Sequence, residues 1–481
     1  MRSFSEFKKL IEEKQQYEKY ADFNGDILVL GYGSIGQPIL PLILRHLNVD
    51  PNKITVLEKD DHSELFNSRH KGTGITYVPN SEVTKNNYEK VLSKYVSNGG
   101  LIINCSLNID AASILSWCMD NDVMQIDTSL ERWDDEPDEE IPNPANRTLF
   151  HTHKELRSKF ENTQGKSTCL VTHGANPGYV THLTKRALLE LAGKNVKVPT
   201  SKEEWAQLMK KLGVKVVHVA ERDTQIIDEP KEKGEFVNTW SCEGFWAEGR
   251  APSEMGWGTH ENKHPEGGKS QKGGTAAYVN APGVSVLMKS WVPKGGQYNG
   301  FCIQHSESIT ISEYFTTEDN SFRPSVYYVY QPSDAAITSV HEMRGHELDM
   351  QSKERIVKNE IISGIDELGI LLIGDKFVYW HGSQLDIDTA RKMLPGESAT
   401  SMQVAGSLLG AIVWMIKNPK QGYTEPESVP FKEILDIGDM YWAPLASVKS
   451  TWTPNVDKNS LFYREYDKSN PCSFENFRVW S

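Results

Sequence analysis

The sequence lacks the features that define several large classes of protein. Its six cysteines are scattered without a C-x-x-C pair, so neither a disulfide framework nor a thiolate zinc site is indicated. No basic run accompanies the net charge of −13, which argues against a nucleic-acid partner. The opening residues MRSFSEFKKL carry charges where a signal peptide needs an apolar segment. We therefore expect a reduced, cytoplasmic protein.

Long apolar runs and metal-binding patterns are also missing. The longest apolar run, Val404 to Ile416, contains glycine and serine and is too short to span a membrane, so it predicts a buried helix. The histidines form no H-E-x-x-H pattern, and no metal site is predicted. The glycine-rich stretch 267–274 lacks the order of a phosphate-binding loop, and we expect it to be a mobile loop near the entrance of the site.

An apolar run that stops at three glycines is the clearest motif present. Residues 26–37 read DILVLGYGSIGQ, in which Gly31, Gly33 and Gly36 follow the spacing G-x-G-x-x-G. The first glycine permits a tight strand-to-helix turn, the second lets backbone N–H groups approach a pyrophosphate, and the third lets the helix pack on the strand. The phosphates would lie at the helix N-terminus, beside Ser34 and Ile35. This stretch predicts a dinucleotide-binding site.

A second β-rich run, KITVLE at residues 53–58, ends in Glu58. An acid at this position accepts hydrogen bonds from the adenosine ribose, and its charge repels a 2′-phosphate. Its distance from Gly31 is somewhat longer than the usual spacing of about 20 residues, which a longer helix or loop would absorb. We therefore expect NAD, and not NADP, as the cofactor.

Further strands are predicted over residues 74–78, 101–106 and 123–128, separated by polar helical stretches. This alternation is typical of a Rossmann-type doubly wound parallel sheet, an α/β fold. Ligands of such sheets bind beyond the carboxyl ends of the strands. Capping of the following helix is the alternative role for each acid there. The polar residues expected to face cofactor and substrate are Ser106, Asn108, Asp110, Asp127, Thr128 and Glu131.

Residues 169–180, CLVTHGANPGYV, predict a strand that gives way to a helix. Asn176 and Pro177 would either cap this helix or, in the functional interpretation, bind the cofactor, with Asn176 across the cleft from the nicotinamide.

A short amphipathic helix is also predicted over residues 4–20, and a polar surface loop over residues 134–146.

Residues 215–224 and 235–242 alternate apolar and polar side chains, which predicts strands of a separate α+β domain. Tryptophans and carboxylates then alternate between residues 240 and 261. A ring face attracts a cation and a desolvated carboxylate pairs with it, so this pattern indicates a diammonium substrate. A lone tryptophan is more often a core residue. The stretch contains Trp240, Glu243, Trp246, Glu248, Glu254, Trp257 and Glu261.

Several of these stretches resemble a known family. Residues 31–36 (GYGSIG), Asp127-Thr128 and 174–178 (GANPG) resemble the saccharopine dehydrogenase superfamily and, within it, the bacterial homospermidine synthases. Residues 238–245 (NTWSCEGF), 380–385 (WHGSQL) and 399–404 (ATSMQV) fit the same family and extend the resemblance over nearly the whole chain. The resemblance implies NAD held as a recycled prosthetic group, a cytoplasmic homodimer, and condensation of two putrescine molecules with loss of ammonia.

The resemblance also implies roles for single residues. Trp240 would be the cation-binding residue, and the acids Glu221 and Glu248 would flank the diamine. For His305, a satisfied buried histidine is the alternative to a proton-shuttling or orienting role. The residues implied to act on the diamine are Trp240, Glu221, Glu248, His305 and Asn176, and those implied to bind it are Asp110, Glu131 and Glu243.

Two other functions stay open at this stage. A saccharopine or carboxynorspermidine-type reductase that uses NAD(P) would need an arginine clamp for its substrate carboxylates, for which Arg222 and Arg250 are candidates. A non-catalytic NAD-binding scaffold would bind the cofactor without forming a product. The expected domains are 1–175 with a returning helix 399–418 for the cofactor, 176–398 for substrate and dimerisation, and a wrapping tail 419–481.

Overall fold

The computed structural model describes residues 17–133, 143–455, 461 and 465–479. The chain divides into two units, each of which is described by itself. Unit 1 consists of Met1–Pro142, Thr152–Tyr179 and Ser401–Tyr441, and unit 2 consists of Asn143–His151, Val180–Thr400 and Trp442–Ser481. Most of the helix predicted over 4–20 and of the loop predicted over 134–146 lies outside the described residues.

Unit 1 is built on a seven-stranded sheet in which all neighbouring strands are parallel. Its strands are β2 (Ile27–Leu30), β4 (Ile54–Leu57), β5 (Thr76–Val78), β6 (Leu101–Asn104), β7 (Met124–Asp127), β8 (Cys169–Leu170) and β22 (Tyr423–Thr424). They lie in the order β22-β8-β7-β6-β2-β4-β5. The strands β2, β6 and β7 are buried at every residue, as strands covered on both faces are. The predicted Rossmann-type α/β class is confirmed.

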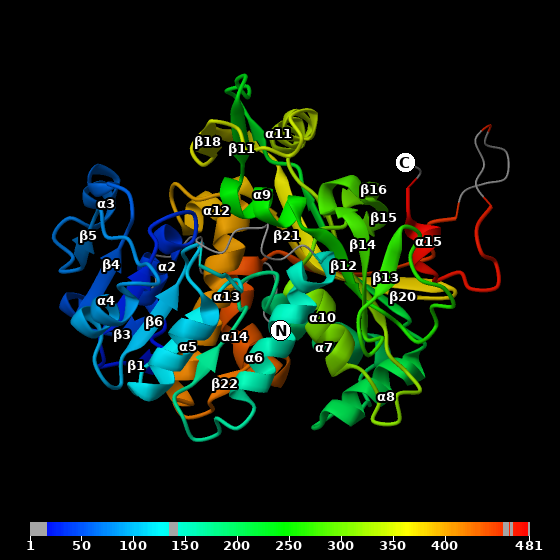
Figure 1. Cartoon of the computed structure of the whole chain (residues 1–481), viewed down its shortest axis with the longest axis horizontal. Helices are drawn as coiled ribbons and strands as arrows, with labels where there is room; N and C mark the ends of the chain where they lie inside the picture. Colours follow the sequence, from blue (N-terminus) through cyan, green and yellow to red (C-terminus); the bar gives the residue numbers. More distant parts are fainter. Residues whose placement is uncertain (1–16, 134–142, 456–460, 462–464, 480–481) are drawn as a thin grey trace. The chain divides into compact units, whose positions relative to one another are not determined.

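The helices of unit 1 alternate with these strands along the chain (Figure 1). They are α2 (Gly36–His46), α3 (Ser63–His70), α4 (Tyr88–Tyr95), α5 (Ala111–Asp120), α6 (Leu149–Phe160), α13 (Ala399–Lys417) and α14 (Phe431–Trp442). The start of α6, up to His151, belongs to unit 2. Short elements of unit 1 are β1 (Ala21–Asp22), which pairs with β3 (Leu47–Asn48), and the 3-10 turns η1 (Pro51–Lys53) and η5 (Pro426–Ser428). The 3-10 turn η3 (Pro144–Arg147) belongs to unit 2.

Helix α13 covers the predicted buried helix. It is the one helix among the described residues that is long and apolar enough to cross a membrane, and 89% of its most apolar window is buried inside the protein. Such burial is typical of a core helix. The chain returns to unit 1 at Ser401, within this helix, and β22 then joins the edge of the parallel sheet beside β8.

Unit 2 contains a ten-stranded mixed sheet. Its strands are β9 (Val216–Asp223), β12 (Pro252–Gly256), β13 (Gly268–Ser270), β14 (Ala276–Pro282), β15 (Leu287–Val292), β16 (Gly296–Phe301), β17 (Ser325–Gln331), β20 (Ile365–Gly374), β21 (Phe377–Asp386) and β23 (Leu445–Ser450). The main order is β13-β14-β12-β17-β9-β20-β21-β23, with β15 and β16 branching from β17. β13 lies within the stretch 267–274, so the loop predicted there is wrong at residues 268–270.

Helices and two small sheets complete unit 2. The helices are α7 (Tyr179–Ala192), α8 (Lys202–Leu212), α9 (Cys242–Arg250), α10 (Ser306–Tyr314), α11 (Asp334–Gly345), α12 (Ile387–Met393), α15 (Phe474–Phe477) and the 3-10 turn η4 (Gly283–Ser285). The small sheets pair β10 (Ile226–Ile227) with β19 (Ile361–Ser363), and β11 (Glu235–Asn238) with β18 (Lys353–Ile356). This separate α+β unit matches the predicted class.

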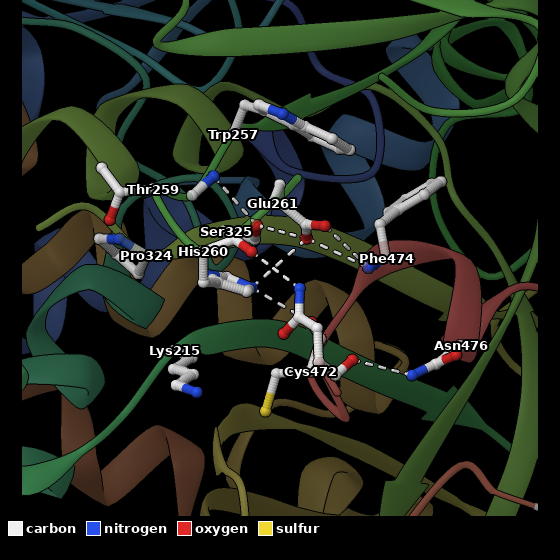
Figure 2. A network of polar contacts seen from close by, with 12 residues as sticks. Lys215, Trp257, Thr259, His260, Glu261, Pro324, Ser325, Cys472, Phe474 and Asn476 are labelled. Carbon is white, nitrogen blue, oxygen red and sulfur yellow. Dashed lines mark hydrogen bonds and ion pairs between the residues drawn. The ribbon is translucent and has the colours of Figure 1, made fainter. Parts of the chain in front are cut away.

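The C-terminal segment, residues 465–479, packs on the rest of unit 2 (Figure 2). The Phe474 N–H donates to both carboxylate oxygens of Glu261, at 3.1 and 3.2 Å. Asn470 Nδ2 donates to the His260 carbonyl at 2.7 Å, and the His260 ring contacts the Cys472 carbonyl at 3.1 Å. The Phe474 side chain is fully buried, so this segment is part of the core of unit 2.

Candidate functional site

The turn between β2 and α2 has the geometry of a dinucleotide-binding loop. Gly31 has a φ of +92°, and a Cβ at Gly36 would lie 2.0 Å from the Gly31 carbonyl oxygen, so both positions require glycine. A Cβ at Gly33 would meet no atom within 4 Å, so protein packing does not explain this glycine. Ile35 supplies no side-chain cap and the first turn of α2 holds no acid, whereas Ser34 is buried beside it. The positive helix end is therefore suited to a phosphate.

Glu58 directly follows β4 and is tied to this turn. Its Oε2 accepts a hydrogen bond from the Tyr32 N–H at 2.5 Å, and its Oε1 accepts one from the Asp60 N–H at 3.2 Å. The side chain is buried. Because each carboxylate oxygen can accept a second hydrogen bond, Glu58 can still bind a ribose hydroxyl.

Ser106 and Asn108 follow β6, next to the glycine turn. A Cβ at Gly31 would lie 2.8 Å from the Ser106 Oγ, which shows how closely the two segments approach. The Asn108 N–H donates to Glu131 Oε2 at 3.4 Å, and the Ser129 hydroxyl donates to Glu131 Oε1 at 2.8 Å. Glu131 therefore links the segments that follow β6 and β7.

Asp110 acts as the N-cap of α5. Its Oδ1 accepts hydrogen bonds from the N–H and the hydroxyl of Ser113, at 2.7 and 2.5 Å. This is the capping alternative considered for it.

Asp127, at the end of β7, holds the segment that follows β8. Its Oδ1 accepts a hydrogen bond from the Thr172 N–H at 2.6 Å, its Oδ2 accepts one from Gln125 Nε2 at 2.8 Å, and its carbonyl accepts one from the His173 N–H at 2.8 Å. Burial raises the pKa of Asp127 to about 7, although the bonds from Thr172 and Gln125 oppose the shift. Asp127 is only 1% exposed and both its carboxylate oxygens accept bonds inside unit 1, so a role in shaping the cofactor loop fits it better than direct binding.

Asn176 and Pro177 lie in a tight turn between β8 and α7. The Gly174 N–H donates to the Pro177 carbonyl at 2.7 Å, which closes the turn. A Cβ at Gly174 would lie 3.7 Å from the Thr128 Cβ, so the segments that follow β7 and β8 are adjacent. The structure thus gathers the cofactor residues predicted after β2, β4, β6, β7 and β8 at one edge of the sheet.

Glu221 lies on one face of the central strands of unit 2. In the parallel pair β9–β17, Glu221 is opposite Tyr330 and Val219 is opposite Tyr328. Side chains alternate along a strand, so Glu221, Tyr328 and Tyr330 share a face. The Tyr328 hydroxyl donates to Glu221 Oε2 at 2.5 Å, and the two tyrosine rings stack with centroids 5.4 Å apart.

His305 lies between two carboxylates beside Glu221. Its Nδ1 is 3.0 Å from Glu307 Oε2, and its Nε2 is 3.3 Å from Glu248 Oε2. Its ring centroid is 4.3 Å from that of Tyr328. Burial would lower the pKa of His305, but the charges of Glu307 and Glu248 outweigh burial and raise it well above the usual value. The two flanking carboxylates therefore favour the protonated form of His305, with Nδ1 within hydrogen-bonding distance of Glu307 and Nε2 in ion-pair contact with Glu248.

Trp240 is anchored to the same cluster. Its Nε1–H donates to the Tyr330 hydroxyl at 3.0 Å, and its ring centroid is 5.9 Å from that of Phe245. Trp240 is only partly buried, whereas Tyr330 and Phe245 are almost fully buried. The indole is thus held by buried neighbours and keeps part of its surface exposed.

The buried acids on this face of unit 2 have raised pKa values. Burial raises the pKa of Glu221 to about 8, with the Tyr328 hydrogen bond opposing the shift and Asp223 adding to it. Burial likewise raises the pKa of Asp223 to about 6 and that of Asp366 well above its usual value. Asp366 on β20 pairs with Asp223 on β9, so the row of acids continues across two strands. Acids with such pKa values can exchange protons near neutral pH.

The remaining tryptophans and acids of the stretch 240–261 make other contacts. Glu254 accepts hydrogen bonds from the N–H groups of Leu149 and Phe150, at 2.8 and 3.0 Å, and so caps the start of α6. Trp257 packs on Phe474, with ring centroids 5.8 Å apart. The interpretation of the whole stretch as one cation site is therefore wrong for these residues and for Glu261, which binds the C-terminal segment.

Trp246 and Glu243 lie on α9, as Glu248 does. The Trp246 ring stacks under the Arg250 guanidinium, with the charged carbon 4.2 Å from the centroid. Glu243 is partly buried in the first turn of the helix.

Arg222, next to Glu221 on β9, points to the opposite face of the sheet and donates to Gln331 at 3.2 Å. The contacts of Arg222 with Gln331 and of Arg250 with Trp246 therefore give no support to a carboxylate clamp at the cluster of Glu221 and His305.

Sequence reasoning missed three members of this cluster, Glu307, Tyr328 and Tyr330. The alternating tyrosines in SVYYVYQ, residues 325–331, were the available signal, since they place two rings on one face of a strand. Among the described ranges, no group of three or more His, Cys, Asp or Glu residues is arranged to hold a metal ion.

Comparisons with known proteins agree on one family. Residues 27–170 match the saccharopine dehydrogenase NADP binding domain, and residues 174–448 match the saccharopine dehydrogenase C-terminal domain. The chain is 37% identical to a homospermidine synthase of Mesorhizobium japonicum, covering 97% of this chain and 98% of the relative. It is 36% identical to one of Blastochloris viridis, covering 96% and 98%. The crystal structure of a Legionella pneumophila homospermidine synthase in complex with NAD matches with a TM-score of 0.87, 35% identity and coverage of 95% and 98%.

Proposed function

Because this chain belongs to the homospermidine synthase family of saccharopine dehydrogenase-like proteins, we propose that it condenses two putrescine molecules to homospermidine and ammonia. The reaction proceeds through imine intermediates and has no net redox change. The observation that best supports this function is the buried cluster in which His305 bridges Glu248 and Glu307, with Glu221 and the anchored Trp240 beside it.

Unit 1 has the features needed to bind NAD. Bound NAD would accept a hydride from the substrate and later return it. The glycine turn and the free positive end of α2 would hold the pyrophosphate, and Glu58 would hold the adenosine ribose. The matched domain is described as NADP-binding, but the carboxylate of Glu58 would repel a 2′-phosphate, so NAD is the proposed cofactor. The Legionella relative was crystallised with NAD.

The charges of the cluster suit a diamine. Two carboxylates around one imidazolium leave a net negative charge, and Glu221 adds another whenever it is ionised. A protonated amine would be attracted to these acids and to the face of Trp240. Cationic iminium carbons formed during the reaction would be stabilised in the same way.

Glu221 is the best candidate for the proton acceptor. An aliphatic amine has a pKa near 10 and must lose a proton before its carbon can give up a hydride. Glu221, with a pKa of about 8, is partly ionised at neutral pH and can take that proton. His305 already carries its proton, so it would orient the substrate or donate a proton to the leaving ammonia. Asn176, Asp110, Glu131 and Glu243 remain proposed substrate residues from the family resemblance.

The cellular setting is part of the same proposal. We expect a cytoplasmic homodimer, in line with the family resemblance. Gel filtration with light scattering would give the mass of the particle and so test the dimer.

The purified protein with excess putrescine and catalytic NAD tests the function. The expected result is homospermidine and ammonia in equal amounts, many times the amount of NAD, without accumulation of NADH. A reductase would instead consume or form one reduced cofactor per product, and a scaffold would bind NAD and form no triamine. Either of these results would refute the proposal.

A further inference from the structure

Tyr328 contacts two of the proposed catalytic groups at once. Its hydroxyl donates to Glu221 Oε2 at 2.5 Å, and its ring lies 4.3 Å from the His305 ring, tilted by 48°. The Tyr328 ring also stacks on that of Tyr330, whose hydroxyl accepts the hydrogen bond from Trp240. Only 2% of the Tyr328 side chain is exposed, so the ring is held firmly by its neighbours.

We propose that Tyr328 is a positioning residue that favours the ionised form of Glu221 and aims it for proton transfer, while fixing the imidazole of His305 beside it. This inference rests on the proposed function and assigns a role to a residue outside the family resemblance. A hydroxyl that donates to a carboxylate stabilises the charged form of the acid. The ring at the same time blocks rotation of His305 away from its two glutamate partners.

The hydroxyl should therefore control the pH at which Glu221 works. Burial raises the pKa of Glu221 to about 8, and the Tyr328 hydrogen bond is the largest effect that opposes this rise. Removing the hydroxyl should raise the pKa of Glu221 by about one to two further units, since a hydrogen bond to a charged group is worth that much. Less Glu221 would then be ionised at neutral pH.

The neighbouring tyrosine offers a matched control. Tyr327 is on the same strand but on the opposite face, where its ring packs against Phe474 and His218. Its hydroxyl is buried and has no hydrogen-bond partner within the part of the chain that the structure describes. Tyr327→Phe thus removes a buried hydroxyl from the same strand without touching Glu221.

The test compares the wild-type enzyme, Tyr328→Phe and Tyr327→Phe in triamine formation between pH 6 and pH 10. In Tyr328→Phe, the rise of kcat/KM with pH should move upward by about one to two units, with a loss of at least about tenfold at pH 7 that is recovered at high pH. Tyr327→Phe should follow the wild type. An unchanged profile for Tyr328→Phe, or an equal loss at every pH, would overturn the inference.

A second measurement does not depend on activity. Infrared difference spectroscopy can follow the protonated carboxyl band of Glu221, assigned by its disappearance in Glu221→Gln. The band should persist to higher pH in Tyr328→Phe than in the wild type, and identical titrations would refute the role of Tyr328. If the wild type forms no triamine, the proposed function fails, and the infrared titration still decides the inference on Tyr328.

Discussion

Replacement of Trp240 should weaken catalysis without weakening cofactor binding. Its indole is fixed by the hydrogen bond to Tyr330 and partly exposed beside the acids of unit 2. A cation on the face of a tryptophan in a desolvated site gains about 2 kcal/mol. Trp240→Ala should therefore lower kcat/KM for putrescine by about 30-fold. Trp240→Phe keeps a weaker ring face and should lose about fivefold.

The assay is the initial rate of homospermidine formation at saturating NAD, with NAD affinity measured separately by calorimetry. Trp246→Ala is the matched control, because Trp246 lies on α9 nearby but stacks on Arg250 instead of joining the cluster. It should retain turnover per folded molecule. A Trp240→Ala enzyme within about twofold of the wild type, or a loss explained entirely by weaker NAD binding, would refute the cation-stabilising role.

Three further outcomes are expected. Glu58→Ala should weaken NAD binding by about tenfold in calorimetry, while NADP binding should improve relative to NAD binding. Equal losses of affinity for both cofactors would contradict the proposal that Glu58 binds the adenosine ribose. Gly36→Ala should destabilise the protein and abolish NAD binding, because its Cβ would lie 2.0 Å from the Gly31 carbonyl; an unchanged melting temperature would argue against that packing. Burial raises the pKa of Glu254 from 4.5 to about 8, so this acid contributes stability below pH 4.5 that is lost as the pH rises towards 8. Between about pH 4.5 and pH 8, the free energy of unfolding should fall less steeply with pH in Glu254→Gln than in the wild type. Urea unfolding at several pH values measures this dependence, and equal slopes for the two proteins would refute the prediction.

The parts of the structure that depend on local sequence were predictable. The glycine turn follows from the conformational demands of Gly31 and the close packing at Gly36, both of which are set within a few residues. The parallel strands were predicted because they are short apolar runs separated by helical stretches. The class of the fold therefore followed from spacing and alternation.

The substrate cluster depends on contacts between distant strands, which spacing does not specify. Period-two alternation shows that Tyr328 and Tyr330 share a face, but only the parallel register of β17 with β9 brings Glu221 to them. The prediction that the stretch 240–261 forms one cation site failed for a related reason. Helix α9 ends at Arg250 and β12 starts at Pro252, so Glu254 points away to cap α6 despite its closeness in sequence to Glu248.

The most direct test of the central claim is a crystal structure of the protein with NAD and putrescine bound. We predict one amine nitrogen of putrescine within about 3 Å of a carboxylate oxygen of Glu221 or Glu248, and within about 6 Å of the Trp240 ring centroid. The nicotinamide should face the adjacent carbon of the diamine. A diamine bound away from both the acids and the indole, with the cofactor out of reach of its carbon, would contradict the account.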